Sequence, residues 1–199
     1  NGYIDIHCHM LPAVDDGSSS MEQSIRMAKQ AAMEGFSDII LTPHQKADRK
    51  CVTYEGTLRR MQLLQNRVDE LRIPVRFHPG AEIISSYGYL PVLAHVERYL
   101  SVNSESGRAQ QLKQNTGCFF QVNASSLTGE AGFAGKNASR KIVRQGLADF
   151  IATDSHNDEG RSPRISHCAQ WLEKKLGRGE MERLLVHNPR AVLDDCPLE

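Results

Sequence analysis

Short apolar runs of strand length alternate along this chain with segments of helical periodicity. The strand-like runs are Tyr3–Ile6, Asp38–Thr42, Val75–Phe77, Leu90–Ala94, Cys118–Val122 and Asp149–Thr153. Regular alternation of this kind predicts an α/β fold in which a parallel sheet or barrel is covered by helices.

The helix-like segments carry their own start and stop signals. Ser19 and Glu22 have the spacing of a capping box, and Gly35 marks the end of the helix that follows. A second apolar stripe at helical spacing occupies residues 58–71 and stops before Pro74. Further helices are expected at about 137–145, 165–176 and 181–186.

Composition narrows the classes of protein that remain. The 199 residues suit one domain, 1–199, and the 24 basic residues balance the 24 acidic ones, so no overall charge favours nucleic acid or an anionic membrane. No apolar run approaches the roughly 20 residues of a membrane span. The five cysteines are scattered without a C-x-x-C pair, which favours a cytoplasmic location over a disulfide framework.

Histidine and acidic residues gather where the expected strands end. His7 and His9 are two positions apart on one strand, so both imidazoles face the same side. In a parallel barrel the carboxyl ends of the strands meet at one rim, where an active site forms. Eight candidate metal ligands would meet there: His7, His9, Asp16, His44, Glu82, His95, Asp154 and His156. Mixed histidine and carboxylate ligands suit manganese, iron or zinc.

Other polar residues have less specific explanations. Arg98 follows His95 by three residues, and its guanidinium either binds an anionic substrate or forms a loop ion pair. Asp15 is expected as a turn or helix-start residue. His78, His167 and His187 do not follow strand ends in the same way and are expected as surface or packing residues.

One interval is too short for the expected topology. A crossover between parallel strands needs at least about 10–12 residues besides the next strand, but few residues separate Glu82 from the strand-like run at Leu90. A segment is therefore expected to be missing between about residues 85 and 87, either through disorder in a crystal or through deletion.

Several motifs, taken in order, resemble one known family. They are DIHCHMLP (residues 5–12), VDDG (14–17), TPH (42–44), GAE (80–82), HVER (95–98) and TDSH (153–156). The order resembles the PHP (polymerase and histidinol phosphatase) family, and most closely its bacterial manganese-dependent protein-tyrosine-phosphatases of capsule and exopolysaccharide regulation. The likeness runs from about Tyr3 to Leu193.

This resemblance implies a distorted, TIM-barrel-like (β/α)7 barrel with two or three divalent metal ions, manganese foremost, at the carboxyl rim of the strands. One metal would bind His7, His9, Glu82 and Asp154. A second would bind His44, Glu82 and His95, and a third would involve Asp16 and His156. Arg98 would bind phosphate or stabilise the transition state.

The chain departs from the family pattern at three places. Gln45 stands where the family usually has histidine, and Val96 stands where it usually has proline. The family's strand–helix–strand segment before the position of His95, which contains a further glutamate ligand, has no counterpart, in agreement with the short interval.

The predicted function is hydrolysis of phosphotyrosine by a metal-activated water. The expected partner is a phosphotyrosine protein, namely a bacterial tyrosine kinase of capsule or exopolysaccharide synthesis. Neither nucleic acid nor a membrane span is expected, and the oligomeric state, a homo-oligomer included, stays open. Three alternatives remain: a phosphoesterase acting on a small molecule such as histidinol phosphate, a metal-dependent amidohydrolase, and a non-catalytic module that binds a phosphoprotein.

Overall fold

The computed structural model describes residues 2–45, 53–83, 91–99, 102 and 107–198. Contacts divide the chain into two compact units, each built from two stretches of sequence. The first unit consists of Asn1–Ser85 and Thr153–Arg164, and the second consists of Ser86–Ala152 and Ile165–Glu199.

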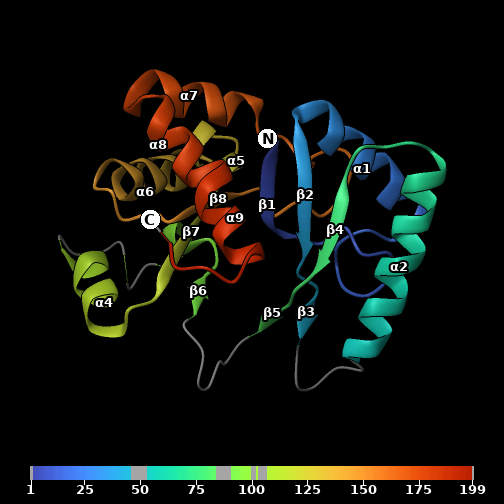
Figure 1. The fold of residues 1–199 in the computed structure, drawn as a ribbon. Coiled ribbons are helices and arrows are strands. Elements are labelled where there is room, and N and C mark those ends of the chain that lie inside the picture. Colours follow the sequence, from blue (N-terminus) through green and yellow to red (C-terminus); the bar gives the residue numbers. More distant parts are fainter. Residues whose placement is uncertain (1, 46–52, 84–90, 100–101, 103–106, 199) are drawn as a thin grey trace. The chain divides into compact units, whose positions relative to one another are not determined.

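The first unit is built on two small parallel sheets (Figure 1). The larger has the strand order β1-β2-β4, with strands at Tyr3–Cys8, Phe36–Leu41 and Arg76–Pro79. The smaller pairs β3, His44–Gln45, with β5, Glu82–Ile83, in a register that sets His44 opposite Glu82. Two residues predicted to share a site are thus adjacent through backbone pairing.

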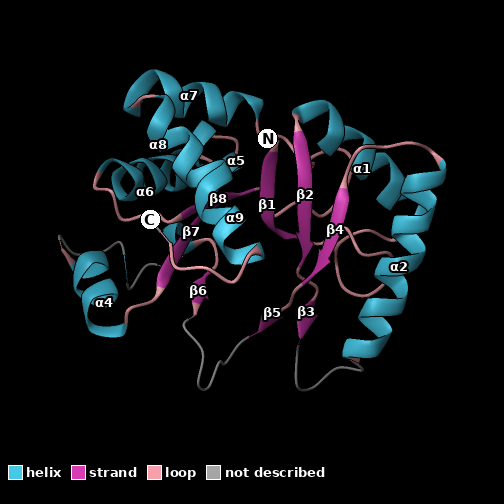
Figure 2. Cartoon of the chain, in the orientation of Figure 1, coloured by secondary structure: helices cyan, strands magenta, loops and turns pink. Residues whose placement is uncertain are grey.

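Two helices pack against the larger sheet. Helix α1, Met21–Glu34, contacts β2, and α2, Tyr54–Glu70, contacts β4 (Figure 2). The Ser20 side chain accepts a hydrogen bond from the Gln23 backbone N–H, so the N-cap is Ser20 and not the predicted Ser19. The core between helices and sheet contains the fully buried Ile4, Met27, Ile39, Leu41 and Leu64.

The second unit holds a parallel sheet of order β6-β7-β8, at Val92–Leu93, Phe119–Asn123 and Phe150–Ala152. Phe120 and Phe150 are fully buried at its centre. The helices of this unit are α4 Arg108–Thr116, α5 Ala124–Thr128, α6 Phe133–Arg144, α7 Ser166–Leu176, α8 Arg178–Glu182 and α9 Asn188–Leu193. A 3-10 turn, η1 at Val96–Arg98, and a π-helical turn, η2 at Arg183–His187, complete it.

The predicted α/β class with parallel strands is confirmed, because every strand pair among the described residues is parallel. These strands form three small sheets, and closure into a (β/α)7 barrel stays a prediction. The interval suspected of lacking a segment, residues 85–87, lies outside the described residues.

Three helices, α4, α5 and α9, were not predicted from the sequence. In α4 the one buried residue is Ala109, so this polar helix has no apolar stripe to reveal it. No helix in the described part of the chain is both long enough and apolar enough to cross a bilayer.

Candidate metal centre

The site begins at the buried end of β1. The Nε2 atoms of His7 and His9 lie 3.2 Å apart, whereas the Cys8 thiol lies on the other side of the strand, 3.8 Å from the Ile40 carbonyl oxygen. Both residues are at least 96% buried. The period-two geometry predicted for this motif is therefore present.

Two carboxylates converge on this histidine pair. Glu82 Oε2 lies 3.3 Å from His7 Nε2 and 3.4 Å from His9 Nε2. Asp154 Oδ1 lies 3.6 Å from each of the same two nitrogen atoms. Glu82 lies in β5, whereas Asp154 lies far from it along the sequence.

These distances fit the coordination sphere of a divalent cation. Four ligand atoms placed tetrahedrally about 2.1 Å from an ion lie about 3.4 Å from one another. The ligand atoms of His7, His9 and Glu82 lie 3.2–3.4 Å from one another, and Asp154 Oδ1 lies 3.6 Å from both imidazole nitrogens. Donors of this kind, three of them on buried side chains, would be costly to hold together without a cation, because like groups face one another at close range.

A second group of donors lies beside the first and shares His9 with it. One ligand atom from each of His9, Asp16, His44 and His156 lies within 4.8 Å of the other three. Asp16 Oδ1 is 3.2 Å from His44 Nε2 and 3.9 Å from His156 Nε2. His44 Nδ1 is also 3.0 Å from Glu82 Oε2, so Glu82 lies next to both groups.

Asp15 orients the histidines from outside. Its carboxylate Oδ2 lies 2.7 Å from His9 Nδ1 and accepts the His44 backbone N–H at 3.1 Å. The other oxygen, Oδ1, accepts the Gly17 N–H at 2.9 Å. A proton held on His9 Nδ1 leaves Nε2 as the ligand atom, the arrangement that carboxylate partners give to metal-bound histidine. The sequence-based prediction of a turn residue missed this role.

Arg161, which the sequence analysis did not single out, positions Asp154. Its Nη2 donates to Asp154 Oδ2 at 2.9 Å, which leaves Oδ1 toward the histidines. The backbone N–H of His156 donates to the Arg161 carbonyl oxygen at 2.8 Å and closes this loop. Arg161 belongs to a polar loop without periodicity, so only its distance of five residues from His156 could have drawn attention to it.

Asp5 joins β1 to the segment that carries Asp154. Its Oδ1 accepts the backbone N–H of Thr153 at 3.0 Å and that of His7 at 3.3 Å, and its Oδ2 accepts the Thr153 hydroxyl. Burial raises the pKa of Asp5 to about 6, despite these hydrogen bonds. Asp5 is therefore a positioning residue for both ends of the site.

The imidazoles of the centre differ in their affinity for protons. Burial lowers the pKa of His9, but hydrogen bonds to Asp15 and Glu82 outweigh it and raise the pKa to about 9. Burial, together with the charges of His9 and Arg161, lowers the pKa of His156 to about 4. Without a cation, the cluster therefore holds a proton on His9 and keeps His156 neutral at pH 7.

Seven of the eight predicted ligands therefore lie together in the first unit, namely His7, His9, Asp16, His44, Glu82, Asp154 and His156. His95 and Arg98 belong to the second unit, where the His95 backbone N–H donates to Gln121 Oε1 at 2.8 Å and Arg98 ends η1. Their roles as ligand and phosphate-binding residue stay predictions. His78 hydrogen-bonds the buried Asp38 at 2.9 Å and lies outside both donor groups.

The fold and this cluster define an α/β protein with a candidate centre for divalent cations, built from histidine and carboxylate side chains. The chain belongs to the family described as "Capsular polysaccharide synthesis, CpsB/CapC", whose family model matches residues 3–88 and 84–194. This confirms the resemblance drawn from the ordered motifs.

Among the relatives, the tyrosine-protein phosphatase YwqE of Bacillus subtilis (strain 168) is 28% identical, over 96% of this chain and 91% of that protein. The tyrosine-protein phosphatase CpsB of Streptococcus pneumoniae is 24% identical, over 96% of this chain and 98% of that protein. A solved structure described as "Crystal structures of YwqE from Bacillus subtilis and CpsB from Streptococcus pneumoniae, unique metal-dependent tyrosine phosphatases" matches this chain with a TM-score of 0.92. It is 26% identical and covers 98% of this chain and 96% of that one.

A β-aspartyl dipeptidase from Fervidobacterium islandicum AW-1 is more distant. It matches with a TM-score of 0.51 and 14% identity, over 96% of this chain and 74% of that one. At this identity the match shows a likeness of fold alone.

The alignments also bear on the short interval before His95. The family model matches in two pieces that meet at residues 84–88. The alignment with YwqE runs over 233 positions, whereas 96% of this 199-residue chain is about 191 residues, so about 40 positions of the alignment have no residue of this chain.

Proposed function

We propose that this chain is a metal-dependent protein-tyrosine-phosphatase that hydrolyses phosphotyrosine in a protein substrate. The observation that carries the proposal is the convergence of the Glu82 and Asp154 carboxylates on the Nε2 atoms of His7 and His9, at 3.3–3.6 Å. Support comes from the structural match at a TM-score of 0.92 to proteins described as metal-dependent tyrosine phosphatases.

Two or three divalent ions, manganese foremost, would occupy the centre. His7, His9, Glu82 and Asp154 would hold one, and Asp16, His44 and His156 another, with Glu82 between them. When bound, such ions supply a Lewis acid and an activated water for phosphoester hydrolysis. Asp15 keeps the Nε2 atom of His9 directed inward, and Arg161 keeps Asp154 Oδ1 toward the histidines.

Arg98 would bind the phosphate of the substrate. A planar guanidinium can donate two parallel hydrogen bonds to phosphate oxygens and offset the charge that develops on them. The leaving group is a phenolate, a weak base that departs with little acid assistance. His156 is neutral at pH 7 because its pKa is lowered to about 4, so it is a poor proton donor in the metal-free state.

The proposed substrate is a bacterial tyrosine kinase of capsule or exopolysaccharide synthesis, and the proposed location is the cytoplasm. The family's description, capsular polysaccharide synthesis, supports the process. The names of the relatives, tyrosine-protein phosphatases, support the reaction.

We further propose that the chain is one PHP domain with the strands of a distorted (β/α)7 barrel, from which a segment is missing between about residues 85 and 87. The two-piece family match and the longer alignment support this deletion. Loss of the segment would remove a glutamate ligand that the family resemblance implies, so the ion that involves His95 would bind most weakly.

The test combines elemental analysis with turnover. Protein purified without added metal should contain about two divalent ions per chain and hydrolyse a phosphotyrosine peptide, with activity lost to a strong chelator and restored by Mn²⁺. Preference for histidinol phosphate would instead support a small-molecule phosphoesterase. Bound metal with peptide binding but no hydrolysis would indicate a non-catalytic module, and absence of metal would refute the proposal.

A further inference from the structure

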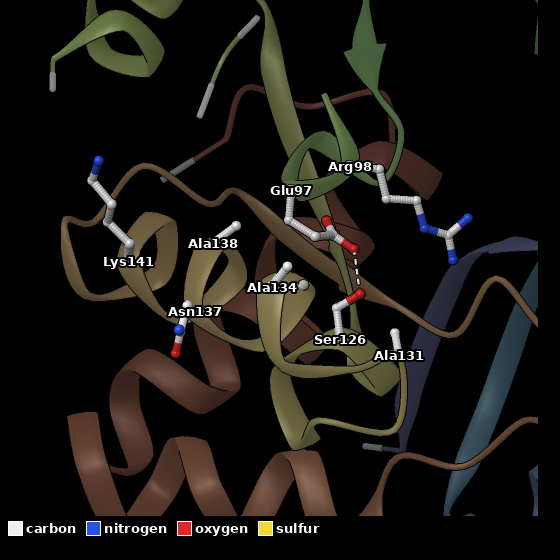
Figure 3. A pocket seen from close by; sticks show the side chains of 9 residues that line it. Glu97, Arg98, Ser126, Ala131, Ala134, Asn137, Ala138 and Lys141 are labelled. Carbon is white, nitrogen blue, oxygen red and sulfur yellow. Dashed lines mark hydrogen bonds between the residues drawn. The ribbon is translucent and has the colours of Figure 1, made fainter. Parts of the chain in front are cut away.

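The second unit contains a pocket, and the proposed hydrolysis gives the pocket itself no role. Its volume is about 640 Å³, and it lies between η1 and α6 (Figure 3). Figure 3 shows Glu97 and Ser126 hydrogen-bonded in the middle, with Arg98 and Lys141 at opposite ends. The volume falls in the range of about 300–1,000 Å³ that is usual for ligand pockets.

One wall of this pocket is made of small side chains. Ala134, Gly135 and Ala138 line it from one face of α6, and Ala131 lines it from the turn before this helix. Ala134 is exposed and Ala138 half-buried. The wall therefore leaves room for a side chain of another protein.

The charges around the pocket are mostly positive. Helix α6 carries four basic residues, Lys136, Arg140, Lys141 and Arg144, and no acidic one. Lys141 lines the pocket, and no carboxylate in the described part of the chain lies within ion-pair distance of its ammonium group. Because the whole chain has a net charge of zero, this helix is a local source of positive potential.

The one acidic residue in the lining offsets little of this charge. Glu97 is 5% exposed, and its carboxylate accepts hydrogen bonds from the Ser126 hydroxyl at 2.7 Å and the Asn123 backbone N–H at 3.4 Å. Burial raises the pKa of Glu97 above its usual value. The exposed ammonium group of Lys141 therefore contributes a positive charge to the pocket.

We propose that this pocket binds an acidic side chain of the substrate protein, from the stretch of chain next to the phosphotyrosine. The proposal rests on the proposed function. Arg98 lines the pocket and is also the residue proposed to bind the phosphate, so neighbouring substrate residues would come within reach of Lys141. The small side chains of the wall leave space for the acidic side chain, and the Lys141 ammonium group attracts its carboxylate.

The experiment measures binding by fluorescence anisotropy, so it does not depend on turnover. Two labelled peptides carry a non-hydrolysable phosphonate analogue of phosphotyrosine. One has Asp and Glu beside it, and the other has Asn and Gln at the same positions. We expect the protein to bind the acidic peptide about fivefold more tightly, which corresponds to about 1 kcal/mol for an exposed charge pair.

Two variants alter the pocket by different means. Lys141→Gln removes the charge, and Ala134→Leu fills the space at an exposed helix position that tolerates leucine. Each should bring the affinities for the two peptides to within about twofold, as expected when a contact worth about 1 kcal/mol is lost. Arg144→Gln is the matched control, because it removes one positive charge from the last turn of the same helix outside the pocket lining.

Equal binding of the two peptides by the unmodified protein would overturn the proposal, as would unchanged preference in both variants. An equal loss in Arg144→Gln would show general attraction to the helix instead of a pocket. If the peptides bind with the expected preference but phosphotyrosine is not hydrolysed, the proposed function fails while the pocket stands.

Discussion

Asp15 and Asp16 are adjacent in the sequence but face the candidate metal centre differently. Asp16 directs its carboxylate toward His44 and His156, whereas Asp15 accepts hydrogen bonds from His9 Nδ1 and two backbone N–H groups. The turn requires glycine at position 17, because the Cβ atom of any other residue there would lie 2.1 Å from the His9 carbonyl oxygen. The one residue is a ligand candidate and the other a support for ligands.

Replacement of Asp15 by Asn should weaken Mn²⁺ binding by about 10–100-fold, the usual cost of losing an outer partner of a metal-bound histidine. The amide can no longer stabilise a proton on His9 Nδ1 with a charged acceptor. Isothermal titration calorimetry measures the change. Asp69→Asn on the exposed face of α2 is the control, and equal affinities in the two variants would show that Asp15 has no orienting role.

The pKa of His9, raised to about 9, predicts a pH dependence of metal binding. Since a cation must displace this proton, Mn²⁺ affinity should rise about tenfold per pH unit between pH 7 and 9. Calorimetry in buffers of different ionisation enthalpy counts the released protons. The metal-free protein should show the opposite trend, with stability from the raised pKa present below pH 6.5 and lost as the pH rises through about 9. Affinity that does not change with pH would contradict the assignment.

At the scale of elements, strand ends were the informative part of the sequence. His7, His44 and Glu82 could be predicted as neighbours because parallel strands deliver their carboxyl ends to one edge. The register of β3 with β5 bears this out for His44 and Glu82. Arg161 could not be predicted in this way, because its place depends on how the loop after His156 folds back.

The link between β1 and the segment at 153–156 depends on Asp5. Asp5→Ala should lower the free energy of unfolding by about 3–5 kcal/mol, because three donors lose their buried acceptor. Chemical denaturation followed by circular dichroism measures this loss. Thr153→Val removes one of the three hydrogen bonds and should cost about 1 kcal/mol. Similar costs for both variants would mean that Asp5 contributes little beyond the hydroxyl contact.

At the scale of the whole molecule, the predicted missing segment concerns how the chain connects its strands. The match to the family model breaks at residues 84–88, the interval that crossover length had already marked as too short. The geometry of chain connections thus predicts a missing segment that no single motif could show. The metal ligands of the second unit were harder to predict. His95 is a single candidate there, and it precedes η1 with a positive φ of 40°.

Insertion of the corresponding segment of about 40 residues from YwqE between Ser85 and Ser86 should raise the metal content by about one ion per chain. The inserted segment would supply the further carboxylate ligand that the family resemblance implies. Inductively coupled plasma mass spectrometry measures the content. A glycine- and serine-rich insert of equal length is the control, and equal metal content in both chains would show that the missing stretch supplies no ligand.

The hydrogen bonds between Asp5 and Thr153 join positions that are 148 residues apart. During synthesis, a growing chain that ends before Asp154 has most of the first unit but lacks two of its donor side chains. Metal acquisition is therefore a late step, available once the ribosome has released residues 153–164. Any cation bound earlier would meet an incomplete coordination sphere and exchange readily, so the ion that is finally retained is chosen after translation of this segment.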